Sequence, residues 1–304
     1  MQRFNRLSAA RRPPRRKPRL AAPGSDAPAD AGSVIRRLVL IALVAATVPA
    51  IPASAAASDP SVFSNGEVSL RLVRASEPVD GAVRAALIVD LAPGWKTYWL
   101  DPGASGVPPQ IDLSKTAGFQ TIRARFPAPH RFGEAETRAN GYKGDVAFAF
   151  ELDVEPGETI GTIEASVFMG VCQEICIPVQ ASLAASATGA EADAAVAKAF
   201  AALPREAGDD AVTISGDATA LRITVKDPDV APGSGAPDLF VTSRDGWYFD
   251  EPTQVSTQGG VSVFAVPVAE APSGVSGPPE MVDLVYTRDG AALEAAAVPV
   301  APQG

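Results

Sequence analysis

Short stretches in which apolar and polar residues alternate cover most of the chain beyond residue 58. Residues 68–73 and 221–225 place an apolar side chain at every second position, which is the period of a half-buried β-strand. Similar stretches occupy residues 83–89, 121–126, 146–154, 159–169, 239–241, 261–266 and 281–286. Many short strands, separated by Pro and Gly turn signals and with almost no helical pattern, predict an all-β antiparallel sandwich rather than a parallel sheet with crossover helices.

Residues 190–203 are the exception, because their larger apolar side chains recur at helical spacing. These side chains are Val196, Phe200 and Leu203. Thr188 and Glu191 have the spacing of a capping box, and Pro204 ends the run. We therefore expect one short helix.

The helix divides the β-rich chain into two segments. Residues 58–186 are expected to form an immunoglobulin-like antiparallel β-sandwich, and residues 187–210 a helical linker. Residues 211–304 are expected to form a second, smaller β-sandwich-like domain. This second segment has no cysteine or histidine, so its expected role is that of a scaffold or docking surface.

The N-terminal region has the pattern of an exported protein. Residues 34–57 combine a basic start, an apolar run and small residues before the cleavage points, after Ala55 or Ala57, and so predict a secretory signal peptide. Residues 1–33 are rich in Arg and Pro. We interpret them as a disordered extension, or as a mis-assigned one if translation begins at Val34. The protein is expected in the periplasm.

Cleavage would change the charge of the protein. Residues 1–57 hold 10 of the 26 basic and 2 of the 35 acidic residues, which leaves 16 basic and 33 acidic residues, a formal charge near −17. A strongly acidic protein is a poor ligand for nucleic acids and for anionic membrane surfaces. No other stretch is apolar and long enough for a transmembrane helix, so we expect none in the mature chain.

The only two cysteines, Cys172 and Cys176, lie four positions apart. An extended strand would separate them too far for a disulfide, so we expect a tight turn between two strands. A structural bridge closing about five residues would remove only about 2 kcal/mol of unfolded-state entropy. Redox or metal chemistry is therefore the leading interpretation, and a passive bridge is the alternative. Cys172 is the expected attacking thiol, from its place at the start of the loop.

Several residues could modify this pair. Glu174 would tend to raise a thiol pKa, and no Lys or Arg is close in sequence to lower it. His130, the only histidine, is either a structural loop residue, a proton acceptor or a metal ligand. No cofactor is expected under the redox interpretation. In a copper-binding alternative, Cu(I) would be held by the two cysteines with Met169 or His130.

An aromatic cluster precedes the cysteines in the sequence, at Trp95, Tyr98 and Trp99. These side chains are expected either to pack in the core or to form a partner-docking platform. The Pro- and Gly-rich residues 101–109 that follow are expected to form a rigid loop, which would shape the docking face if it lies beside the cysteines.

Four ordered motifs resemble a known family. Residues 94–109, 126–132 and 141–144 and the cysteine loop resemble the N-terminal periplasmic domain of DsbD-type thiol:disulfide interchange proteins, closest to the suppressor of copper sensitivity B branch. The resemblance covers roughly residues 60–185. It departs from the best-known members in the shorter Cys-x3-Cys spacing, so their shielding cap loop is not mapped onto this chain.

The resemblance implies an immunoglobulin-like domain whose cysteines accept electrons from a membrane thiol-reductase and reduce periplasmic thiol proteins. It also implies a link to cytochrome c biogenesis or copper tolerance. Because the sequence ends at Gly304 without a membrane or thioredoxin-like domain, we expect the electron donor to be a separate protein. The expected activity is that of a protein-disulfide reductase or electron shuttle. The alternatives are a copper-tolerance protein and a non-catalytic binding module with a structural disulfide.

Overall fold

The computed structural model describes residues 59–134, 137–227 and 235–302. The extension over residues 1–33 and the signal peptide over residues 34–57 lie outside these described residues and stay predictions. Within the described ranges, no helix is long and apolar enough to cross a membrane.

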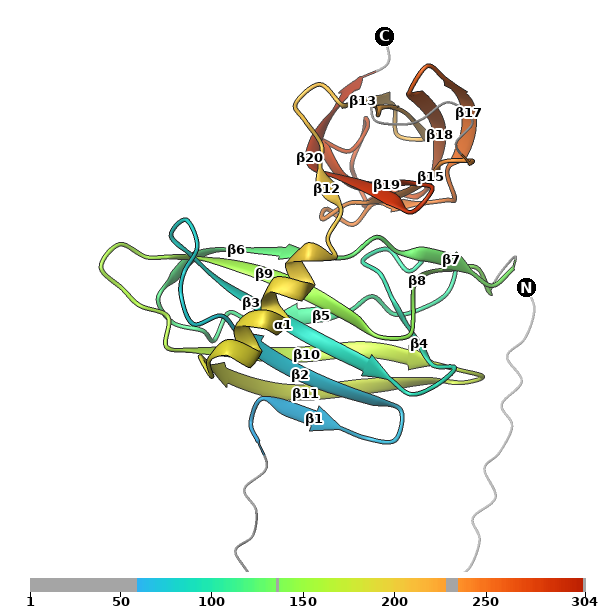
Figure 1. The fold of residues 1–304 in the computed structure, drawn as a ribbon. Coiled ribbons are helices and arrows are strands. Elements are labelled where there is room, and N and C mark those ends of the chain that lie inside the picture. Colours follow the sequence, from blue (N-terminus) through green and yellow to red (C-terminus); the bar gives the residue numbers. More distant parts are fainter. Residues whose placement is uncertain (1–58, 135–136, 228–234, 303–304) are drawn as a thin grey trace, which may run out of the picture. The chain divides into compact units, whose positions relative to one another are not determined.

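The first β-rich segment contains two sheets (Figure 1). One has the strand order β1-β2-β3-β9-β6, and every neighbouring pair in it is antiparallel. In that order the strands are Val62–Ser64, Val68–Arg74, Ala82–Leu91, Val146–Val154 and Phe119–Arg125. We call this sheet A.

The other sheet, sheet B, has the order β11-β10-β4-β8-β7, with β5 added beside β10. In that order the strands are Cys176–Ser186, Thr162–Cys172, Lys96–Tyr98, Ala139–Lys143 and His130–Phe132, and β5 is Gln110–Asp112. Strands β10 and β11 form a long hairpin that pairs without a register shift from Thr162 opposite Ser186 to Cys172 opposite Cys176.

The core lies between the two sheets. Strand β10 sends every second side chain into it, from Ile163 to Val171, as the period of a strand requires. Sheet A meets these side chains with large apolar residues that are almost fully buried: Leu70, Leu72, Leu87, Phe148, Phe150 and Leu152. Each such side chain contributes about 1.5–3 kcal/mol through burial. The expected all-β, immunoglobulin-like sandwich is confirmed.

Helix α1 (Ala190–Ala201) lies across sheet A (Figure 1). Its buried face, with Val196 at the centre, packs on Val73 and Ala86. The capping box expected at Thr188 is wrong: the N-cap is Gly189, and no side chain caps the helix. The helix therefore depends on its packing against the sheet more than on its own N-terminal signal.

The second β-rich segment forms a nine-stranded sheet system with its own apolar cluster. Its main path has the order β15-β19-β20-β13-β14-β18-β16, while β12 pairs with β20 and β17 with β18. The strands of the main path are Asp238–Thr242, Met281–Arg288, Ala291–Pro302, Val212–Gly216, Ala220–Lys226, Val261–Glu270 and Tyr248–Phe249, and β12 and β17 are Arg205–Glu206 and Thr253–Gln258. The pairings of β20 with β12 and β13 are parallel, so this part is not purely antiparallel.

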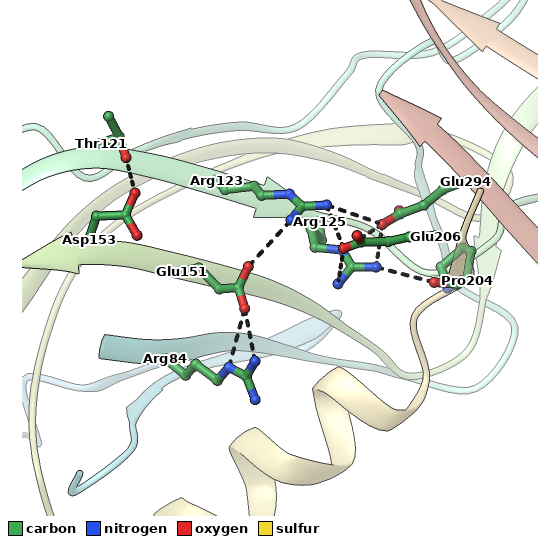
Figure 2. A network of polar contacts seen from close by, with 9 residues as sticks. All are labelled: Arg84, Thr121, Arg123, Arg125, Glu151, Asp153, Pro204, Glu206 and Glu294. Atoms are coloured by element: carbon green, nitrogen blue, oxygen red, sulfur yellow. Dashed lines mark hydrogen bonds and ion pairs between the residues drawn. The ribbon is translucent and has the colours of Figure 1, made fainter. Parts of the chain in front are cut away.

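Ion pairs join sheet A to the second segment (Figure 2). On β6, Arg123 and Arg125 both contact Glu206 and Glu294. Arg123 also reaches Glu151 on β9, which in turn accepts hydrogen bonds from a third arginine on β3. The Arg125 and Glu294 side chains are mostly buried, so solvent screens this pair less than the exposed ones.

Candidate functional site

The two cysteines form a disulfide at the end of the β10–β11 hairpin. They lie directly opposite one another in the register, with their Cα atoms 4.1 Å apart. A three-residue loop, Gln173 to Ile175, joins the strands, as the close spacing of the cysteines predicted. The bridge therefore occupies the tip of the hairpin.

The two sulfur-bearing residues differ in exposure. Cys172 is 1% exposed, whereas Cys176 is exposed on β11, which is an edge strand of sheet B. Ile175 beside it is 69% exposed. A thiolate attacks only a sulfur that it can reach, so an incoming partner meets Cys176 first.

Tyr98 connects the bridge to β4. Its hydroxyl donates a hydrogen bond to Cys172 Sγ at 2.8 Å and lies 3.4 Å from Cys176 Sγ. Burial raises the pKa of Tyr98 above its usual value, so the phenol keeps its proton and remains a donor. A donor at this position stabilises a thiolate that forms on Cys172 when the bridge opens.

Two lysines lie in the same row as the buried cysteine. Lys96 on β4 is opposite Cys172 on β10, and Lys143 on β8 is opposite Lys96. Residues paired across antiparallel strands share a face of the sheet, which here is the face away from the core. The two lysine amines lie 5.0 and 5.5 Å from the centre of the Phe132 ring.

This row changes the electrostatics expected from the sequence. No cation is near the cysteines along the chain, but sheet pairing brings Lys96 next to Cys172. A nearby ammonium favours the thiolate form of a cysteine. The acidic Glu174 is also present, exposed in the hairpin loop.

The loop over residues 101–109 lies against Tyr98. A Cβ placed on Gly106 would come within 2.5 Å of the Tyr98 ring, and Val107 packs beside Gly170 on β10. At the start of the loop, Asp101 accepts a hydrogen bond from the Gly103 amide at 2.8 Å. The loop therefore lies beside the residue that contacts both sulfurs.

The other aromatic candidates have different surroundings. Trp99 is 2% exposed and packs edge-on against Phe240 of the second segment, with ring centres 6.0 Å apart. Trp95 is partly buried against the core. Of the three aromatic residues considered for docking, Tyr98 is the one that contacts the disulfide.

The proposed copper ligands are not brought together. Met169 is fully buried in the core, on the opposite face of β10 from Cys172. His130 is exposed on β7, opposite Gly141 and two strands from Tyr98, and has no hydrogen bond to either cysteine. Among the described residues, no three His, Cys, Asp or Glu side chains form a group that could hold a metal ion. Copper binding stays a hypothesis.

Lys96, Lys143 and Phe132 were not singled out from the sequence. All three lie within the motifs of the family resemblance, but far from the cysteines along the chain. The signal that could have found them is alternation: residues two apart on a strand share a face, so Lys96 shares the face of Tyr98. Strand order, which the sequence does not display, was also required.

Residues 71–188 match the family model described as thiol:disulfide interchange protein DsbD, N-terminal. Among solved structures, the fold is similar to the N-terminal periplasmic domain of ScsB from Proteus mirabilis, with a TM-score of 0.59 and 21% identity. That match covers 79% of this chain and 98% of that chain, so it extends into the second β-rich segment. The human desmocollin-1 ectodomain matches with 10% identity over 79% of this chain and 50% of that chain, but its TM-score of 0.18 is too low to indicate a shared fold. No curated protein sequence matches the chain.

Proposed function

Residues 71–188 of this chain form a domain of the DsbD N-terminal family, and from this premise we propose a specific role in disulfide exchange. The protein accepts electrons from a separate membrane thiol-reductase and passes them to periplasmic thiol proteins through Cys172 and Cys176. The observation that carries the proposal is the asymmetry of the bridge: an exposed Cys176 is joined to a buried Cys172 that has its own hydrogen-bond donor.

The exchange has two balanced halves. In the first, a thiolate of the reduced donor attacks Cys176 Sγ, the bridge breaks, and its electron pair goes to Cys172 Sγ. The second donor thiol then attacks the mixed disulfide, so the donor leaves as a disulfide and this protein holds two thiols. In the second half, Cys176 attacks a substrate disulfide and Cys172 resolves the mixed disulfide.

The burial of the cysteines supports a different attacking residue from the one expected from the sequence. Position in the loop favoured Cys172 as the attacking thiol, but the Cys172 side chain is covered and Cys176 is accessible. We therefore assign attack to Cys176. Tyr98 supports Cys172 as the leaving and resolving group, because its hydroxyl points at that sulfur.

Single-cysteine variants test this assignment. Cys172→Ser retains the exposed Cys176 as a thiol, which should rapidly attack a model protein whose single cysteine is carried as a mixed disulfide with thionitrobenzoate. The new mixed disulfide forms between the two proteins, and thionitrobenzoate leaves as a coloured thiolate. Cys176→Ser retains only the buried Cys172 and should react at least about tenfold more slowly. Equal trapping by the two variants would contradict the assignment to Cys176.

The reduction potential tests the proposal itself. Wild-type protein is equilibrated in glutathione or dithiothreitol buffers, and free thiols are counted by mass shift. Exchange proteins have potentials between about −120 and −270 mV, whereas structural disulfides lie below about −300 mV. A potential below about −300 mV would make the Cys172–Cys176 bridge a structural clasp and refute the proposed function.

A further inference from the structure

Lys96 and Lys143 lie in one row across sheet B, beside the disulfide. Neither lysine has an Asp or Glu within ion-pair distance among the described residues. Several arginines of the same domain, by contrast, are paired, including Arg123, Arg125 and Arg131. Two like charges over one aromatic ring repel each other, and an anion placed between them would relieve that repulsion.

The position of the pair connects it to exchange at the bridge. Pairing across three adjacent strands places Cys172, Lys96 and Lys143 in one line on the outer face of sheet B. Neighbouring strands lie about 4.8 Å apart, so the row extends about 10 Å from the disulfide. A partner whose thiol reaches Cys176 therefore lies over or beside the lysines. The chain as a whole is acidic, with a formal net charge of −9, so this local positive charge would orient an acidic partner toward the disulfide.

We propose that Lys96 and Lys143 form a recognition site for carboxylate side chains that lie next to the reactive cysteine of a partner protein. The inference rests on the proposed exchange at Cys176 and adds the chemistry of its partner. The partner is a protein whose reactive cysteine lies within an acidic local sequence. The two lysines can each bind one of its carboxylate side chains, and the exposed Ile175 beside Cys176 adds an apolar contact. Glu174 in the hairpin loop opposes the attraction and limits its size.

The test compares two short peptides that differ only in charge: one cysteine flanked by glutamates and the same cysteine flanked by glutamines. Each reduced peptide is mixed with the oxidised protein, and mixed-disulfide formation is followed by stopped flow. The peptide thiolate attacks Cys176, and Cys172 leaves as a thiolate that takes up a proton. The measured quantity is the ratio of the two rates, after each is corrected for the thiolate fraction of its peptide.

This ratio separates recognition from general reactivity. Replacing a lysine also changes the stability of the Cys172 thiolate, but that effect slows both peptides equally and cancels. At about 0.01 M ionic strength we expect the acidic peptide to react roughly three- to tenfold faster with the wild type, and the advantage to fade near 1 M. The double variant Lys96→Gln/Lys143→Gln should bring the ratio close to one. The control Lys226→Gln, an exposed lysine of the second segment, should leave it unchanged.

Three outcomes overturn the proposal. These are a ratio near one in the wild type, a ratio that persists in the double variant, and a lysine-dependent acceleration that is larger for glutathione than for the acidic peptide. The last would assign the site to a small anionic thiol instead of a protein. Dithiothreitol, which is uncharged, distinguishes this failure from failure of the proposed function. If it reduces the bridge at a similar rate in every variant, and the reduction potential lies in the range of exchange proteins, disulfide exchange stands whether or not the lysines recognise carboxylates.

Discussion

Replacing Tyr98 by phenylalanine removes one hydroxyl that contacts the disulfide while retaining the ring. That hydroxyl lies 2.8 Å from Cys172 Sγ, so in the reduced protein it donates to the thiolate on this residue. A hydrogen bond to a charged group contributes about 1.5–3 kcal/mol, and one pKa unit corresponds to about 1.36 kcal/mol. Lys96 remains to stabilise the charge in part. We therefore expect the pKa of Cys172 to rise by about one unit.

The rise is measured by titrating the thiolate ultraviolet absorbance in the Cys176→Ser background. In the intact pair, a leaving thiol whose pKa is about one unit higher should slow attack on Cys176 on the order of threefold, using a Brønsted coefficient near 0.5. Exchange rates with a neutral thiol measure this directly.

The control is Tyr142→Phe. Tyr142 is also buried and donates its hydroxyl at 2.8 Å, but to the Pro127 carbonyl, away from the sulfurs. Both variants should lose about 0.5–1.5 kcal/mol of unfolding free energy, and only Tyr98→Phe should change the thiol pKa. An unchanged Cys172 pKa in Tyr98→Phe, or an equal shift in Tyr142→Phe, would refute the assigned role of Tyr98.

Two further predictions concern the loop and the ion pairs. Gly106→Ala places a Cβ 2.5 Å from the Tyr98 ring, at a residue whose φ is +129°. The control is Gly144→Ala, where φ is also positive, at +97°, but no atom lies within 4 Å of the added Cβ. We expect Gly106→Ala to lower the free energy of unfolding by at least about 1 kcal/mol more than Gly144→Ala does. Urea denaturation measures both, and equal losses would exclude the contact with Tyr98. Burial, which outweighs the nearby Arg125, raises the pKa of Glu294, so the folded protein binds this proton at a higher pH than the unfolded chain does. The wild type should therefore gain stability relative to Glu294→Gln as the pH falls through the folded and then the unfolded pKa; a relative loss over that range would show that the pKa is lowered instead.

The sequence determined the elements that local patterns encode. Alternating apolar residues define strands such as β2 and β10, because a strand that is buried on one face requires a period of two. The helical period of residues 190–203 likewise located α1, although the expected capping box at Thr188 does not form and Gly189 is the N-cap. The spacing of Cys172 and Cys176 limited them to a tight turn, and their motifs indicated the family.

Only the tertiary structure decided how the site is composed. Lys96 is 76 positions before Cys172 along the chain, yet the pairing of β4 with β10 places the two side by side. The same pairing decides that Met169 faces the core and Tyr98 faces the sulfurs. The spacing of apolar residues can be read directly from the sequence. The order of strands in a sheet cannot, because it is set by packing between segments that are far apart in sequence. The chemistry around the disulfide therefore appears only once that packing exists.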